Sequence, residues 1–453
     1  MKICVNSQTP VVRFKLSYEN LLEKYGTLSD PLNVKELEEG VDYEFTPGGV
    51  TNMIFPSVKK MIQNGSISNA VWVALGVNSP PNVIVDDILI SHVEIEENVL
   101  REYTWFKEKL WNEIHGISNG KFTTDGFRAY AHYNWINARK MFDYIKDADI
   151  FYIQDFQLLL TGTFIGPPAP ALLRWHVPLV PSVLSDLSKR IIIKGMESFD
   201  AVIVSTRRDL EGLVNSDFRG KAFQLYPYID PGEWYPPAGN DEIDKLKEKI
   251  KLKDDEKLIV LVARMDRIKS QDVGIKALAI LSKKIKCKLL LIGNGSFSSS
   301  QKGGLGYGKG ASWRRELENI SRELGVSDRV FFMGHSTQEE LKAAYSLSSV
   351  VLLTSNIEGF GITVLEGWIH KKPVVVSSGA GASELVINGS NGYVFPAGDY
   401  EKAAEMILKA ITGDPDKLGE YGYESARQCL IDVSVEREKA ILDETSKQFR
   451  LEQ

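Results

Sequence analysis

Two glutamates in the second half of the chain frame a glycine-rich turn and are suited to binding a hydroxyl-rich ligand. Glu358 follows an apolar run of strand length, and the turn Gly359-Phe360-Gly361 leads toward Glu366, with seven residues between the two glutamates. Backbone N–H groups at a helix start, at the positive end of the helix dipole, suit a phosphate or sugar hydroxyls. A helix from this turn carries Glu366 about two turns along the same face, within reach of a second part of a long ligand.

A pair of cations precedes the glutamates in the same half of the chain. Arg264 ends another apolar run, and Lys269 follows it with four residues between them. Two fixed cations at the end of a strand can clamp a diphosphate and neutralise its charge as it leaves. The spacing therefore predicts a diphosphate site.

These residues follow strands in a regular alternating pattern. Five apolar runs, starting at residues 257, 288, 329, 349 and 373, are continuous rather than alternating, which is typical of parallel strands covered on both faces. Helix-period segments separate them, starting near Gln271, Ser312 and the capping-box sequence at Thr337. The pattern predicts a doubly wound parallel α/β sheet.

The first half repeats the pattern less cleanly, so the sequence predicts two Rossmann-like domains around an interdomain cleft. Ligands bind by default in such a cleft. We expect the first domain over 1–230, a hinge and linker over the Pro- and Gly-rich 231–256, and the second domain over 257–430. The remainder, 431–453, is expected to form a helix that packs back toward the first domain.

Composition and charge exclude several classes of protein. The 453 residues carry 60 acidic side chains against 54 Lys and Arg, a net charge of −6, whereas binding to nucleic acid or acidic lipid needs a basic excess. The three cysteines and the scattered histidines show no metal-ligand spacing. No apolar run approaches the roughly 18 residues of a membrane span. We expect a cytoplasmic protein with no nucleic-acid or membrane partner, no metal and no cofactor; the oligomeric state stays open, a homo-oligomer included.

The order Arg-x4-Lys and then Glu-x7-Glu in a second Rossmann half resembles the retaining GT-B glycosyltransferases, above all glycosyltransferase family 4. The resemblance implies that Arg264 and Lys269 bind the diphosphate of a nucleotide-sugar donor. It implies that Glu358 contacts the donor sugar and that Glu366 contacts the ribose. The glycine pair Gly48-Gly49, in the first half, resembles the family's glycine loop that approaches the donor.

The first half resembles the trehalose-6-phosphate synthases over roughly residues 110–206. The matching runs are LWNEIH with Trp111, FYIQD with Asp155 and LLRWHVPLVPS with His176. The resemblance implies that Asp155 binds acceptor-sugar hydroxyls, that His176 lies beside the anomeric carbon of the donor, and that Arg13 and Trp111 help to hold a sugar phosphate. A core role fits Trp111 equally well.

Together the two resemblances imply a retaining, metal-independent glucosyltransferase. It would move glucose from a nucleotide-glucose donor, such as UDP-glucose, to glucose-6-phosphate and form trehalose-6-phosphate. The first domain would bind the acceptor and the second the donor.

Three departures keep other acceptors open. Gln154 replaces the usual His before Asp155, and Glu-Gly-Phe-Gly replaces the Asp-Gly-Met-Asn of the usual synthases. The phosphate-binding arginine of those enzymes has no plain counterpart. Cations in and after the Gly/Ser-rich loop 294–311 are the candidates to replace it: Lys302, Lys309, Arg314 and Arg315. The alternatives are a trehalose synthase that uses free glucose and a glycogen synthase-like enzyme.

Overall fold

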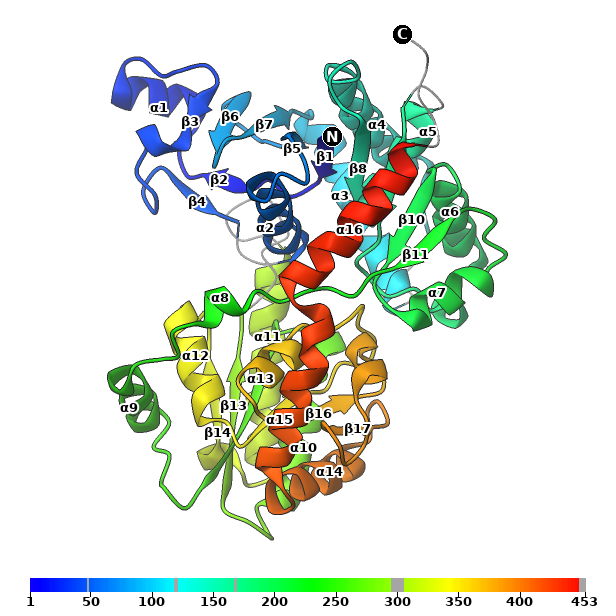
Figure 1. Ribbon diagram of the computed structural model, residues 1–453. Helices are drawn as coiled ribbons and strands as arrows, with labels where there is room; N and C mark the ends of the chain where they lie inside the picture. Colours follow the sequence, from blue (N-terminus) through cyan, green and yellow to red (C-terminus); the bar gives the residue numbers. More distant parts are fainter. Residues whose placement is uncertain (47–48, 118–120, 167–168, 295–304, 448–453) are drawn as a thin grey trace. The chain divides into compact units, whose positions relative to one another are not determined.

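The computed structural model describes most of the chain (Figure 1): residues 1–46, 49–117, 121–166, 169–294 and 305–447. The chain divides into two compact units. Unit 1 comprises Met1–Tyr226 and Val435–Gln453, and unit 2 comprises Pro227–Ser434.

Unit 1 is built on a sheet that has nine strands among the described residues, in the order β11-β10-β9-β8-β1-β5-β7-β6-β3. Neighbouring strands run parallel, apart from the antiparallel pair of β6 and β7. The strands are β1 (Lys2–Ser7), β3 (Leu32–Asn33), β5 (Asn69–Leu75), β6 (Asn82–Val85), β7 (Ile88–Val93), β8 (Ile150–Gln154), β9 (Ala171–Arg174), β10 (Ala201–Val204) and β11 (Ala222–Gln224). The series β7-β5-β1-β8-β9-β10 is the 3-2-1-4-5-6 order of a Rossmann fold, so the winding reverses between β1 and β8.

Helices and a two-stranded antiparallel ribbon complete unit 1. The helices are α1 (Tyr18–Tyr25), α2 (Gly49–Gln63), α3 (Glu97–Ile114), α4 (Thr124–Phe142), α5 (Thr161–Ile165), α6 (Asp186–Met196) and α7 (Arg207–Val214), with α16 (Ile431–Ser446) from Val435 onward. Strands β2 (Val12–Phe14) and β4 (Tyr43–Phe45) pair as a separate antiparallel ribbon. Strand β8 is buried at every position, as expected for a central parallel strand covered on both faces.

Unit 2 has a six-stranded, fully parallel sheet in its described residues, in the order β14-β13-β12-β15-β16-β17. The strands are β12 (Lys257–Val262), β13 (Cys287–Ile292), β14 (Val330–Met333), β15 (Val350–Leu353), β16 (Val374–Ser377) and β17 (Tyr393–Phe395). This is again the 3-2-1-4-5-6 order, with the reversal between β12 and β15. The doubly wound α/β class predicted from the sequence is confirmed in both units.

Helices cover both faces of this second sheet. They are α8 (Pro231–Trp234), α9 (Asn240–Lys249), α10 (Gln271–Leu281), α11 (Leu305–Glu323), α12 (Gln338–Leu347), α13 (Thr363–Ile369), α14 (Tyr400–Thr412) and α15 (Pro415–Ala426). Alternate residues of the central strand separate into two cores: Ile259 and Leu261 pack with α10 and α14, while Leu258 and Val260 pack with α9 and α12. Both faces are therefore apolar, which explains the continuous apolar runs of the sequence.

Two segments differ from the sequence expectation. The stretch 231–256 carries helices α8 and α9, and Leu246 and Ile250 pack into the core of unit 2. The loop expected over 294–311 is helical from Leu305, where α11 begins. The helix is held by the buried side chains of Trp313 and Leu317, four residues apart, and these outweigh the glycines of its first turns.

Candidate active site

The motif residues of unit 2 meet where the winding of its sheet reverses. Arg264 follows β12 and Glu358 follows β15, the two adjacent strands on either side of the reversal. Ligands in open α/β sheets bind at this point, beyond the carboxyl ends of the strands. Lys269 Nζ lies 2.5 Å from Glu358 Oε1, with 12% and 18% of the two side chains exposed. The structure thus joins the cation motif and the glutamate motif at one place.

The turn that carries Lys269 is fixed to the end of β15. Residues Arg267–Lys269 form a 3-10 turn, whose last carbonyl accepts a hydrogen bond from Thr354 Oγ1 at 2.7 Å. The backbone N–H of Asn356 donates to the carbonyl of Ile268 at 3.0 Å. Lys269 therefore approaches Glu358 from a rigid backbone, which reduces the entropy lost on binding a ligand.

Glu358 is held as a carboxylate. Burial by itself would raise the pKa of Glu358, but Lys269, the hydroxyl of Ser355 and the nearby charge of Arg264 together lower it below its usual value. Ser355 Oγ donates to Glu358 Oε2 at 2.5 Å. A carboxylate is an acceptor only, which suits sugar hydroxyls as donors.

Glycines at this turn allow close backbone approach. Gly361 has φ +97°, a left-handed value that favours glycine, and a Cβ there would lie 2.5 Å from Leu353 Cδ2. The side chain of Phe360 is buried, and its carbonyl accepts from the N–H of Ala382. Helix α13 begins only at Thr363, so Glu358 lies before this helix and Glu366 lies within it. The expectation that Glu358 and Glu366 share one helical face is therefore wrong.

Glu366 lies in a different environment from Glu358. Its carboxylate accepts a hydrogen bond from the hydroxyl of Tyr345 in α12. Burial raises the pKa of Glu366 to about 7, an effect that the Tyr345 hydrogen bond partly offsets and the charge of Glu233 in α8 reinforces. Glu366 therefore changes protonation near neutral pH, whereas Glu358 does not.

In unit 1 the residues singled out from the sequence also follow adjacent strands near the reversal point. Asp155 follows β8 and His176 lies just beyond β9. Asp155 Oδ1 accepts from the backbone N–H of His176 at 3.1 Å, and the N–H of Asp155 donates to the carbonyl of Arg174 at 2.8 Å. Asp155 has φ +69°, a strained value for this residue that costs about 1–3 kcal/mol and that these bonds maintain. Burial raises the pKa of Asp155 to about 6, although backbone N–H donors oppose the rise.

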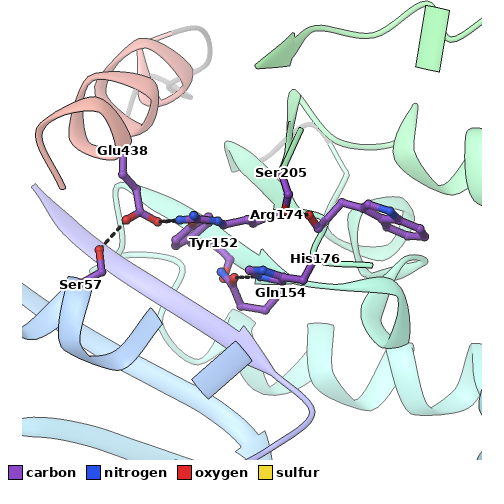
Figure 2. A network of polar contacts seen from close by, with 8 residues as sticks. Ser57, Tyr152, Gln154, Arg174, His176, Ser205 and Glu438 are labelled. Carbon is purple, nitrogen blue, oxygen red and sulfur yellow. Dashed lines mark hydrogen bonds and ion pairs between the residues drawn. The ribbon is translucent and has the colours of Figure 1, made fainter. Parts of the chain in front are cut away.

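A hydrogen bond from Gln154 orients the ring of His176 (Figure 2). Gln154 Nε2 donates to the carbonyl of Tyr152 at 3.3 Å, which turns Gln154 Oε1 toward His176 Nε2 at 3.0 Å. Since an amide oxygen only accepts, His176 Nε2 carries the hydrogen and Nδ1 is the ring acceptor. Burial, assisted by the charge of Arg174, lowers the pKa of His176 well below its usual value. The ring is therefore neutral at pH 7.

Behind Gln154 lies a buried polar cluster that the sequence analysis missed. Glu438 in α16 accepts hydrogen bonds from the hydroxyls of Ser57 and Tyr152 and from the guanidinium of Arg174 (Figure 2). The available signal was the polar residue at every second position of two apolar strands, Tyr152 with Gln154 and Arg174 with His176. Glu438 itself is 264 residues from Arg174 in sequence, and no local pattern marks it.

The remaining predicted site residues are distributed over other elements. Arg13 lies in β2 opposite Glu44 of β4, and burial lowers its pKa while Glu44 opposes the shift. Trp111, on α3, packs against the core of unit 1, and its ring lies 4.1 Å from that of His115. Four further positions complete the set: Gly49 begins α2, Lys309 belongs to α11, and Gly48 and Lys302 lie outside the described residues.

Comparison with known proteins bears first on unit 2. Residues 242–425 match the family model described as Glycosyl transferases group 1. These residues form a group 1 glycosyltransferase domain. The family predicted from the two motifs is confirmed, and Arg264, Lys269, Glu358 and Glu366 all lie within the matched glycosyltransferase domain.

The curated relatives match only part of this chain. The chain spans about half the length of the curated relatives it matches. One of them is the D-inositol 3-phosphate glycosyltransferase of Mycolicibacterium smegmatis, which is 25% identical over 275 residues, 56% of this chain and 59% of the relative.

The chain aligns over nearly its whole length with solved structures. The α,α-trehalose 6-phosphate synthase of Burkholderia multivorans aligns with a TM-score of 0.76 at 15% identity, over 98% of this chain and 97% of the other. A trehalose-6-phosphate structure from E. coli, bound with UDP-2-fluoro glucose, aligns with a TM-score of 0.75 at 15% identity, over 99% of both chains. At this identity the likeness shows the fold, which is the predicted GT-B fold with two Rossmann-like domains.

Two further properties, the grouping of possible metal ligands and the hydropathy of the helices, concern the described residues. Among them, no three or more His, Cys, Asp or Glu side chains group closely enough to hold a metal ion. In the same part of the chain, every helix is too short or too polar to cross a bilayer.

Proposed function

We propose that the chain is a retaining glucosyltransferase that moves glucose from a nucleotide-glucose donor to glucose-6-phosphate, forming trehalose-6-phosphate. The observation that carries the proposal is the group formed by Arg264, Lys269 and Glu358 at the reversal point of unit 2. It combines two cations with a carboxylate that is held ionised, the charge pattern that a sugar diphosphate needs.

On the donor side, Arg264 and Lys269 stabilise the negative charge of the departing nucleoside diphosphate, as fixed cations do in other phosphoryl and glycosyl sites. Lys269 is already bonded to Glu358. Its ammonium group would therefore bind the donor phosphate and the Glu358 carboxylate at the same time. Glu358 accepts hydrogen bonds from donor-sugar hydroxyls. In this proposal no metal ion and no cofactor take part, and UDP-glucose is the expected donor.

The chemical step follows from retention of anomeric configuration. The acceptor hydroxyl oxygen forms the new bond to the anomeric carbon on the face from which the diphosphate leaves. The bond between that carbon and the phosphate oxygen breaks, and the leaving phosphate takes the hydroxyl proton. Asp155 would hold acceptor hydroxyls and His176 would lie beside the reacting carbon. That the two units close on one cleft stays a prediction of the sequence.

Two similarities support a phosphorylated acceptor. The names of the M. smegmatis relative and of the B. multivorans structure both contain a phosphorylated polyol or sugar. Arg13, Trp111 and Lys309 are the described residues that we assign to the sugar phosphate. Free glucose is the competing acceptor, because Gln154 departs from the usual synthase sequence next to Asp155.

Calorimetry tests the proposed donor site, and acceptor kinetics test the proposed choice of acceptor. UDP-glucose should bind the wild-type protein without added metal, and Arg264→Ala should weaken the binding. The ratio kcat/KM should be far higher for glucose-6-phosphate than for glucose. Equal donor binding by Arg264→Ala would reject the diphosphate site, and a preference for free glucose would favour the trehalose synthase alternative.

A further inference from the structure

A continuous row of polar side chains crosses one face of β8 and β9 and ends at His176. Gln154 of β8 pairs in register with Arg174 of β9. Alternate residues of a strand share a face, so Tyr152 lies on the face of Gln154. His176 lies just beyond β9, and its ring Nε2 lies 3.0 Å from Gln154 Oε1. The five-residue series Glu438, Tyr152, Arg174, Gln154 and His176 thus links a helix to the candidate site (Figure 2).

The far end of the row is fully buried and multiply bonded. The side chains of Arg174 and Glu438 are 2% and 0% exposed. Glu438 receives hydrogen bonds on both oxygens, from Ser57 at 2.5 Å on Oε2 and from Tyr152 and Arg174 on Oε1, while Arg174 also lies 3.2 Å from the hydroxyl of Tyr152. A buried ion pair tolerates little displacement, because either charge left unpaired would lose its compensation for desolvation.

The near end of the row sets the ring of His176. Gln154 is held at its amide nitrogen by the carbonyl of Tyr152 and presents its oxygen to His176 Nε2. Tyr152 therefore contributes to both ends, with its hydroxyl on Glu438 and its carbonyl on Gln154. Gln154 and His176 also follow Tyr152 and Arg174 by two positions in the chain, so a backbone displacement at Tyr152 or Arg174 is passed on to the residues that orient the histidine.

We propose that Glu438 of the C-terminal helix is a positioning residue for His176, acting through Tyr152, Arg174 and Gln154. The proposal rests on the proposed function in taking His176 as a site residue. Its structural part, the orientation and tautomer of the His176 ring, is independent of any substrate.

Another ion pair on the same helix provides a matched control. Glu444 of α16 pairs with Lys221 at 2.5 Å, with 53% and 32% of the side chains exposed. This pair also attaches α16 to unit 1, but it has no bonded route to His176 through the residues of the row. Because this pair is exposed and contributes at most about 1 kcal/mol, Glu444→Gln controls for the loss of a negative charge from α16, and loss of stability is controlled by the double variant described below.

The test compares Glu438→Gln with Glu444→Gln by two readouts. Selective ¹⁵N labelling of the six histidines reports the tautomer of His176, assigned from the signals lost in His176→Gln. Glu438→Gln should shift these signals and populate the second tautomer, and Glu444→Gln should leave them unchanged. In the transfer reaction, Glu438→Gln should lower kcat by about tenfold to a hundredfold with little change in the donor KM.

A second variant keeps the test decisive if Glu438→Gln does not fold, since that substitution leaves Arg174 buried without its partner. The double variant Glu438→Met with Arg174→Met replaces both charges by apolar chains of similar length, a change that folded proteins often tolerate. It should keep the fold and show the same change at His176. A folded variant of either kind with wild-type His176 signals overturns the proposal, and so does failure of both to fold while Glu444→Gln folds.

The spectroscopic readout separates this proposal from the proposed function. If no donor and acceptor pair gives turnover, the glucosyltransferase assignment fails, and the His176 signals still decide the positioning role. If turnover is found and the His176 signals do not respond to Glu438, only the positioning role fails.

Discussion

Replacing Lys269 by alanine should impair both catalysis and stability, for separate reasons. Lys269 Nζ lies 2.5 Å from Glu358 Oε1, and the two side chains are 12% and 18% exposed. Loss of one cation from a developing diphosphate anion costs about 3–4 kcal/mol, a factor of roughly 100 to 1000 in kcat. Loss of the partner of a mostly buried carboxylate costs about 3 kcal/mol of unfolding free energy, at the lower end of the range for buried pairs.

The stability part has a defined pH dependence. The pKa of Glu358 lies below its usual value in the folded chain, so its contribution is present above the unfolded pKa and is lost as pH falls through the folded pKa. In Lys269→Ala burial dominates and the pKa of Glu358 rises. The free-energy difference between variant and wild type should therefore be largest near pH 7 and shrink as the pH falls toward about 4.

Urea unfolding at two pH values and steady-state kinetics measure the two effects. The control is Lys276→Ala, which removes a more exposed pair with Asp272 at 2.7 Å in the same unit and should cost less than about 1 kcal/mol. Wild-type kcat in Lys269→Ala would refute the diphosphate role. Unchanged stability near pH 7 would refute the role of the ion pair in holding Glu358.

Three further outcomes follow from the site. Asp155→Asn should abolish a loss of about 3 kcal/mol in unfolding free energy that urea unfolding of the wild type shows between pH 4 and pH 7.5, because burial raises the pKa of Asp155 to about 6 and native ionisation is therefore costly; kcat should fall. Glu366, with a pKa of about 7, should bind the donor as a carboxylate, so the donor KM should rise below that pH in the wild type and stay flat in Glu366→Gln. Exhaustive EDTA treatment should leave transfer activity intact, and restoration of lost activity by magnesium or manganese would contradict the proposed charge compensation by Arg264 and Lys269.

The fold and the grouping of Arg264, Lys269 and Glu358 could be predicted because the signals are local. Continuous apolar runs mark buried parallel strands, and side chains placed directly after such strands meet at one edge of the sheet. Arg264 and Glu358 could therefore be placed together by their positions after two such strands, although 94 positions separate their numbers. The helical start of α11 could not be predicted, because its glycines favour a loop. The burial of Trp313, which stabilises the helix, is known only from the folded structure.

The buried cluster behind His176 illustrates what a single sequence does not contain. Arg174 could be recognised as a charge within an apolar strand, but its partner Glu438 lies in a helix of ordinary composition near the end of the chain. The pKa values of Asp155 and Glu366 depend in the same way on burial by distant elements. Such long-range electrostatics follow from the folded arrangement and not from any local pattern.

Product identification tests the proposed glucosyltransferase activity most directly. The full-length chain would be incubated with UDP-, ADP- and GDP-glucose, each against glucose-6-phosphate, glucose and glycogen, and the products identified by NMR. The proposed function predicts an α,α-linked disaccharide phosphate from glucose-6-phosphate, with release of the nucleoside diphosphate, and loss of this product in Arg264→Ala. Absence of transfer from every donor, or a product with inverted configuration at the donor sugar, would contradict it.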